Sequence, residues 1–170
     1  MKLYVGNRLA GLLLPASLLS FTPAIGQDES GPSQIAMLSG ECQYVAISGN
    51  NFSKFCQGSI VQSVYENEPR TGFTVVIGAG DDVNAIITFS GLEAVKPDAD
   101  SQLQTVDKVI LNLGMEDVEP AVTVVKGSCA YTNPTKGPAT ISCHAFDDDK
   151  SSYILHFRTD GSPPKFMFED

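Results

Sequence analysis

The chain has two histidines, and one of them directly follows a cysteine. A cysteine with a histidine is the pair that thiol nucleophiles use, so Cys143 and His144 are the first residues to weigh for chemistry. Adjacent residues of a strand point to opposite faces, however, and a cysteine in a disulfide has no thiolate to offer. His156 lies in an alternating apolar stretch that is typical of a strand. We therefore assign neither histidine a catalytic role, and two histidines do not make the three-histidine set of a catalytic zinc site.

Carboxylates are more numerous and form four short clusters. These are Asp81-Asp82, Asp98 with Asp100, Glu116 to Glu119, and Asp147 to Asp149. Calcium loops need several oxygens at alternating positions and a glycine for the bend, and none of the clusters has that pattern. Asp81 and Asp82 are the pair we would name for a carboxylate-dependent hydrolase, although the fold sets the separation that such chemistry requires. The sequence predicts no metal site, no cofactor and no specific catalytic residue.

The four cysteines fall into two pairs of equal spacing. Cys42 and Cys56 are fourteen positions apart, and so are Cys129 and Cys143. Four cysteines allow three connectivities, and spacing alone does not choose among them. If each pair closes an antiparallel hairpin, directly opposed cysteines have Cα atoms about 4.5–5.5 Å apart, within the range of a disulfide. We therefore favour two local bridges, 42–56 and 129–143.

The turns that these hairpins require fall where the composition predicts turns. The midpoints are Gly49 and Lys136, in segments rich in Gly, Asn and Pro. Gly and Asn accept a positive φ, and Pro does not continue a central strand. We expect the two hairpin tips to be the surfaces that contact a partner. The tips comprise Gly49, Asn50, Asn51 and Phe52 in the first hairpin, and Pro134, Thr135, Lys136 and Gly137 in the second.

Similarity between the two cysteine units extends beyond their spacing. Residues 40–44 and 127–131 share a Gly-x-Cys-x-Tyr pattern, and each second cysteine is followed by a polar turn and a strand. This pattern predicts two pseudo-repeats, about 40–91 and 120–162, within a single β domain that spans 40–170. Chance recurrence of short β patterns is the alternative.

Short β-rich stretches separated by turns make up the rest of the chain, and helical periodicity is hard to find. The expected fold is all-β, a sandwich or barrel of about eight to ten short antiparallel strands. Residues 27–39 are expected to form a flexible arm, and residues 93–104, which include Pro97, to form a loop. The tail 165–168 follows two prolines and is expected to be an edge strand.

Residues 1–26 have the features of a secretory signal peptide. Lys2 and Arg8 supply positive charge, an apolar stretch follows, and Ala24 and Gly26 precede a plausible cleavage before Gln27. The apolar stretch is shorter than the about 20 residues that a membrane-spanning helix needs, so we expect no stable membrane insertion. The sequence thus predicts an exported protein, periplasmic or extracellular, where disulfides persist.

The chain is acidic, with a formal net charge of −9. A surface of this sign repels phosphate backbones, which argues against nucleic acid as a partner. The leading hypothesis is a non-enzymatic binding or inhibitor-like β module that acts through its hairpin tips, because rigid loops lower the ordering cost of binding. Its expected partner is another protein or an envelope component. The alternatives are the secreted hydrolase and a structural protein of the cell envelope, and the sequence leaves oligomeric state open.

Overall fold

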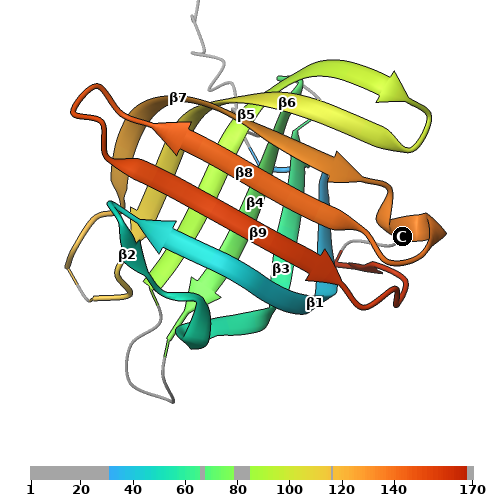
Figure 1. The fold of residues 1–170 in the computed structure, drawn as a ribbon, viewed down its shortest axis with the longest axis horizontal. Coiled ribbons are helices and arrows are strands. Elements are labelled where there is room, and N and C mark those ends of the chain that lie inside the picture. Colours follow the sequence, from blue (N-terminus) through green and yellow to red (C-terminus); the bar gives the residue numbers. More distant parts are fainter. Residues whose placement is uncertain (1–30, 66–67, 79–84, 116, 168–170) are drawn as a thin grey trace, which may run out of the picture. The chain divides into compact units, whose positions relative to one another are not determined.

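The computed structural model describes residues 31–65, 68–78, 85–115 and 117–167. In this part of the chain ten strands form one antiparallel sheet, and eight of them close into a barrel because β1 pairs with both β3 and β9 (Figure 1). The strands are β1 (Gln34–Ile47), β2 (Asn50–Asn51), β3 (Cys56–Tyr65), β4 (Arg70–Ile77), β5 (Ala85–Asp98), β6 (Ser101–Asn112), β7 (Ala121–Thr132), β8 (Thr140–Phe146), β9 (Ser152–Thr159) and β10 (Lys165–Phe166). The predicted all-β fold is confirmed, in its barrel form. The predicted signal peptide lies outside the described residues.

Alternation of buried and exposed residues explains why these segments form a barrel wall. On β8, Ile141, Cys143 and Ala145 are buried, whereas the residues between them reach the surface. On β9, every second residue from Tyr153 to Thr159 is buried. Period-two burial is the pattern of a strand with one face toward a core.

Large apolar side chains fill the middle of the barrel. Phe73, Phe89 and Phe157 are at most 1% exposed and pack with valines, isoleucines and leucines from the surrounding strands. The interior of an eight-stranded barrel is just wide enough to be filled in this way or to hold one small ligand. Because the middle is filled here, space for a ligand is left at the ends.

The two disulfides join Cys42 to Cys56 and Cys129 to Cys143. Both predicted local bridges are therefore confirmed. Cys129 and Cys143 are directly opposed in the β7–β8 ladder, as the hairpin argument requires. Two disulfides in a small domain are typical of an oxidising, non-cytosolic compartment.

The first bridge differs from the simple hairpin that the spacing predicts. Its turn does fall at Ser48 and Gly49, both with positive φ. The ladder between β1 and β3 ends at Ser39, however, so Cys42 and Cys56 lie beyond its last pair, with Cα atoms 6.1 Å apart. The reason is that the end of β1 pairs with β2, and a short 3-10 helix, η1 (Ser53–Phe55), separates β2 from β3. The expectation of directly opposed cysteines is thus wrong for this pair.

The flexible arm expected over residues 27–39 is also wrong for its second half. β1 begins at Gln34, and this part of the strand pairs with β3 on one edge and with β10 on the other. Ala36 and Leu38 are buried in the core. The apolar residues at alternate positions outweigh the polar composition of the segment.

Residues 93–104, expected to be a loop, instead form most of a long hairpin. β5 continues to Asp98, β6 begins at Ser101, and the pairing of the two strands extends to these last residues with register shifts on the way. Register shifts around Val95 leave Pro97 outside the ladder pairs, which is how a strand tolerates a proline.

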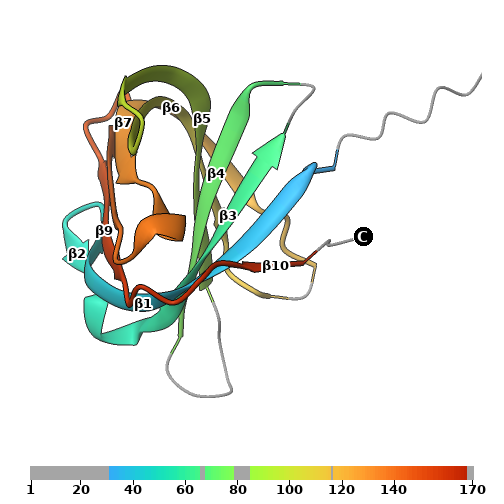
Figure 2. The same ribbon diagram turned by 90° about the vertical axis from the view of Figure 1, so that its right-hand side faces the viewer.

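The end of the described chain returns to the start of the barrel. β10 pairs with Ala36 and Met37 of β1, and Figure 2 shows it lying beside that strand. The predicted edge strand is confirmed for Lys165 and Phe166. The cysteine hairpins involve the first two and the sixth and seventh of the eight barrel strands, and the internal repeat stays a prediction. Within the described ranges, no helix is long and apolar enough to cross a membrane.

Candidate functional site

The structure places the two predicted hairpin tips at opposite ends of the barrel. The first tip follows the C-terminal end of β1, and the second follows the C-terminal end of β7. β7 and β1 run in opposite directions, because three antiparallel pairings, through β8 and β9, connect them. One ligand or one flat surface therefore does not engage both tips of the same molecule.

The first tip is largely occupied by its own contacts. The Asn51 side-chain oxygen accepts hydrogen bonds from the backbone N–H and the hydroxyl of Ser53, at 2.8 and 2.6 Å. Phe52 is half-buried and packs against the core instead of facing solvent. Gly49 and Asn50 are exposed. The tip is thus a well-ordered turn with little free side chain to offer.

The second tip borders a cavity of about 280 Å³ at the mouth of the barrel. Pro134 and Thr135, from the 3-10 helix η2 (Pro134–Lys136), form part of its wall. The remaining wall comes from the N-terminal end of β1, the C-terminal end of β3, the β5–β6 hairpin, the end of β7 and the segment leading into β10. Its other residues are Gln34, Ala36, Gln62, Lys96, Ala99, Asp100, Ser101, Gln102, Tyr131, Thr132, Asn133, Pro164 and Phe166.

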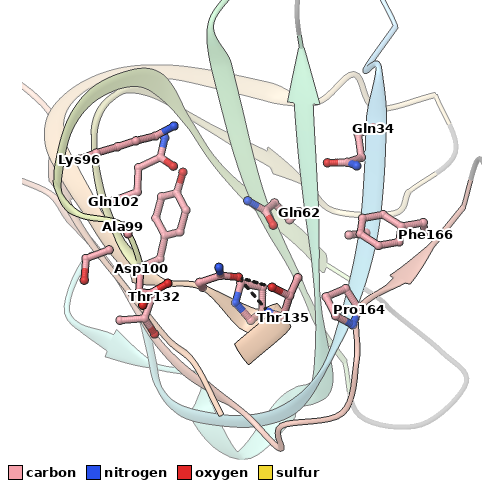
Figure 3. A pocket seen from close by; sticks show the side chains of 15 residues that line it. Gln34, Gln62, Lys96, Ala99, Asp100, Gln102, Thr132, Thr135, Pro164 and Phe166 are labelled. Atoms are coloured by element: carbon pink, nitrogen blue, oxygen red, sulfur yellow. Dashed lines mark hydrogen bonds between the residues drawn. The ribbon is translucent and has the colours of Figure 1, made fainter. Parts of the chain in front are cut away.

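Three glutamine side chains contribute amides to this cavity. Figure 3 shows Gln34 and Gln62 on the side of β1 and β3, near Phe166, and Gln102 on the opposite side. Within the described residues, none of these three amides is hydrogen-bonded to the protein. Each amide presents two donors and an acceptor. The mouth therefore offers hydrogen bonds from two facing walls to a molecule placed between them.

The rim of the cavity is held in place by contacts between η2 and the β5–β6 turn. The Lys136 ammonium group lies 2.5 Å from an Asp100 carboxylate oxygen, and the Asn133 N–H donates to the Asp100 carbonyl at 2.8 Å. The Asn133 side-chain oxygen in turn accepts from the N–H and hydroxyl of Thr135, at 3.0 and 2.7 Å. The second tip is rigid, and one of its residues neutralises the only carboxylate among the described lining residues.

The floor of the cavity passes directly into the core. The ring of Tyr131 packs edge-on against the buried Phe73, with centroids 4.8 Å apart. Below Gln102, on the same face of β6, Gln104 is fully buried and donates to the Thr71 carbonyl at 3.1 Å. The side-chain oxygen of Gln104 has no partner within the described part of the chain. Beneath the cavity, the interior therefore contains both an apolar contact, of Tyr131 with Phe73, and a buried polar side chain, Gln104.

The other candidate residues lie away from this cavity. His144 and His156 are neighbours on the outer wall, with ring centroids 6.1 Å apart, and the His156 Nδ1 lies 2.9 Å from the Ser142 hydroxyl. Asp81 and Asp82 lie outside the described residues. Asp147 to Asp149 form the turn between β8 and β9, where the composition predicts one. No group of three or more potential metal ligands occurs in the described ranges.

Sequence reasoning found one wall of the cavity and missed the others. It named Pro134 and Thr135, but not Gln34, Gln62 or Gln102. The signal for these residues was glutamine on the inward register of a strand, as in the alternation Ile60, Gln62, Val64. Gln102 was hidden because its segment was interpreted as a loop.

Comparison of the chain with protein-family models, with curated proteins and with solved structures gives no match. The function therefore has to be inferred from the chemistry of the cavity itself.

Proposed function

We propose that the protein is a non-enzymatic binding module of the periplasm or extracellular space, which holds a small, polar, uncharged molecule in the mouth of its barrel. The observation that carries the proposal is the set of three glutamine amides facing a common space without partners among the described residues. Amides recognise hydroxyl and amide groups, which both donate and accept hydrogen bonds. The ligand class is accordingly a neutral molecule with several such groups, for example a single sugar residue.

The size and charge of the cavity support this class. A volume of about 280 Å³ lies just below the range of about 300–1,000 Å³ for sites that hold drug-sized molecules, which suits a smaller ligand. The lining contains one lysine and one aspartate, and the aspartate is also paired with Lys136 at the rim, so the described lining presents no uncompensated carboxylate. Phe166, Pro164 and Tyr131 add apolar surface against which carbon atoms of a ligand pack.

The fixed position of the cavity walls also favours a binding role for the second hairpin tip. Both walls are anchored in the barrel, and η2 is fixed to the β5–β6 turn by the contacts of Lys136 and Asn133. A site that is ordered before its ligand arrives loses less conformational entropy on binding. The proposal thus keeps the second predicted tip as part of the binding surface and leaves the first tip out.

Titration of labelled protein followed by backbone amide shifts tests the proposal. The probes are D-glucose, N-acetyl-D-glucosamine and N-acetyl-alaninamide at millimolar concentration. We expect at least one probe to shift resonances of residues 99–102, 131–135 and 164–166 together. No shift at the mouth with any probe, or shifts confined to the other end of the barrel, would contradict the proposal.

Matched variants identify the groups responsible. Gln62→Leu and Gln102→Leu should each weaken binding at least about tenfold, since a ligand hydroxyl loses its partner in a partly buried site. Gln43→Leu, at an exposed position of β1 outside the cavity, is the control. Replacing residues 134–136 by Gly-Ser-Gly should abolish binding, whereas replacing residues 49–51 in the same way should not. Equal losses from the two replacements would exclude a site at the mouth.

A further inference from the structure

Exposed apolar side chains concentrate at the end of the barrel opposite the cavity. Six of them lie on the β6–β7 connection, on the first half of β7 and at the end of β8. They are Leu113 (38% exposed), Met115 (49%), Val118 (45%), Val122 (59%), Val124 (74%) and Phe146 (45%). Single exposed apolar residues are ordinary, but several of them on neighbouring segments are typical of an interaction surface.

The same surface includes a strand edge without a partner. β7 pairs with β6 from Ala121 onward, but its ladder with β8 begins only at Lys126, opposite Phe146. In the described part of the chain, residues 121–125 are therefore hydrogen-bonded along one edge only. Alternate residues of an antiparallel strand direct their N–H and C=O groups to each edge. This segment consequently presents unpaired backbone groups beside Val122 and Val124, which are well suited to strands.

What fits an unpaired edge is another extended strand, and the charges around it favour a second copy of the same segment. Asp117 and Glu119 precede the unpaired residues, whereas Lys126 follows them and Lys108 lies directly across from Val124 on β6. When such a segment pairs antiparallel with itself, the acidic end of each copy meets the basic end of the other. Lys126 also forms an exposed ion pair with Asp148 of its own chain, and Lys108 adds a second positive charge at this end, so the segment is complementary to itself in charge.

We propose that the protein forms a twofold-symmetric dimer by antiparallel pairing of residues 121–125 with the same residues of a second copy. With the symmetry axis at Thr123, Val122 faces Val124 of the partner subunit, and Glu119 approaches Lys126 of the partner subunit. Phe146, diagonal to Val124 across the β7–β8 ladder, extends the apolar contact. The cavity mouths lie at the far ends of such a dimer, so both stay open.

Sedimentation velocity and light scattering over a wide range of protein concentration test the proposal. The wild-type chain should show a concentration-dependent shift from monomer to dimer. Val124→Lys should raise the dimer dissociation constant at least about tenfold, because it places a charge in the apolar contact and beside an existing lysine. Val95→Lys, at a 54% exposed position on the β5–β6 hairpin, is the matched control and should change nothing.

Charge reversal tests the pairing itself. Lys126→Glu and Glu119→Lys should each weaken the dimer, and the double variant should restore it, since the acidic and basic ends are then exchanged in both copies. The ion pair of Lys126 with Asp148 does not confuse this test, because both side chains are almost fully exposed (88% and 94%) and such pairs stabilise a fold little. A wild-type protein that stays monomeric overturns the proposal. The unpaired edge of residues 121–125 would then be available to a strand of a different protein. A dimer that resists Val124→Lys, or charge effects without rescue, overturns it as well.

Discussion

Arg70 links the outer faces of three neighbouring strands. Its guanidinium group donates to both carboxylate oxygens of Asp107, at 2.7 and 2.9 Å, and to the Ser90 hydroxyl at 3.0 Å. The hydrogen bonds from Arg70 hold the pKa of Asp107 below its ordinary value, and those to Asp107 raise the pKa of Arg70. A bidentate pair of this kind is more specific in geometry than an ordinary surface ion pair.

Asp107→Asn should reveal this pair as a pH-dependent contribution to stability. We expect it to lower the free energy of unfolding at neutral pH by about 1 kcal/mol, a modest figure because the Asp107 side chain is 41% exposed. A carboxyl whose pKa is lowered by folding stabilises the fold above its unfolded pKa, and this contribution is lost as the pH falls through the folded pKa. Urea unfolding of both proteins at pH 7 and at about pH 3 should therefore give a smaller difference in acid. Asp148→Asn serves as the control, and a difference independent of pH would contradict the assignment.

Among the elements, the strands whose residues alternate cleanly were the ones that could be predicted. β8 and β9 alternate apolar and polar residues between strong turn signals, and they correspond to the expected hairpin strand that carries Cys143 and to the expected strand around His156. The β5–β6 hairpin was missed because Pro97 and the aspartates of its tip are loop-forming residues by local preference. β5 pairs with β6, and bulges accommodate the residues that do not fit the ladder, so the pairing outweighs the local preference. The local sequence gives little indication of this pairing.

In the first half of β1, strand pairing likewise outweighs the local preference of the residues, and hydrogen exchange tests this directly. The amides of Ala36 and Met37 should exchange with solvent as slowly as those of the central strands, because β1 has partners on both edges at these two residues. Hydrogen–deuterium exchange with mass spectrometry measures this, with residues 48–50, at an exposed turn, as an internal comparison. Rapid exchange at Ala36 and Met37 would instead support the expectation that this segment is a flexible arm.

Only part of the candidate site could be predicted from the sequence, because most of the cavity depends on how distant strands pair. Thr135 belongs to a turn that composition alone predicts, so local signals were enough to find it. Gln62 and Gln102 lie far apart in the chain and share a cavity only because the barrel closes. Which glutamines face inward depends on strand register, and a shift of one residue reverses every assignment.

At the scale of the whole molecule, the two disulfides secure different parts of the barrel. Cys129 and Cys143 are fully buried in the wall between β7 and β8, whereas Cys42 and Cys56 are half-exposed near the first tip. In the chain-entropy account, a loop of this length contributes about 3 kcal/mol per bridge. The equal spacing makes the two contributions similar, but their accessibility to reagents differs.

This difference in burial predicts the order of reduction. With dithiothreitol under native conditions, the bridge between Cys42 and Cys56 should open first, and the buried bridge should open only when the fold itself opens. Timed alkylation followed by peptide mass spectrometry gives the order. The addition of a low concentration of urea should speed reduction of the buried bridge alone. Simultaneous reduction of both bridges in the native protein would show that burial does not protect the second.

The position of β10 beside β1 means that the mouth is assembled from the first and the last strands of the described chain. Gln34 and Phe166 lie near opposite ends of the described sequence, so the pocket is complete only when both of these strands are in place. A partly folded state that lacks either β1 or β10 therefore lacks part of the cavity wall. A ligand bound there should therefore raise the free energy of unfolding of the whole domain as its concentration rises, and not only stabilise one loop.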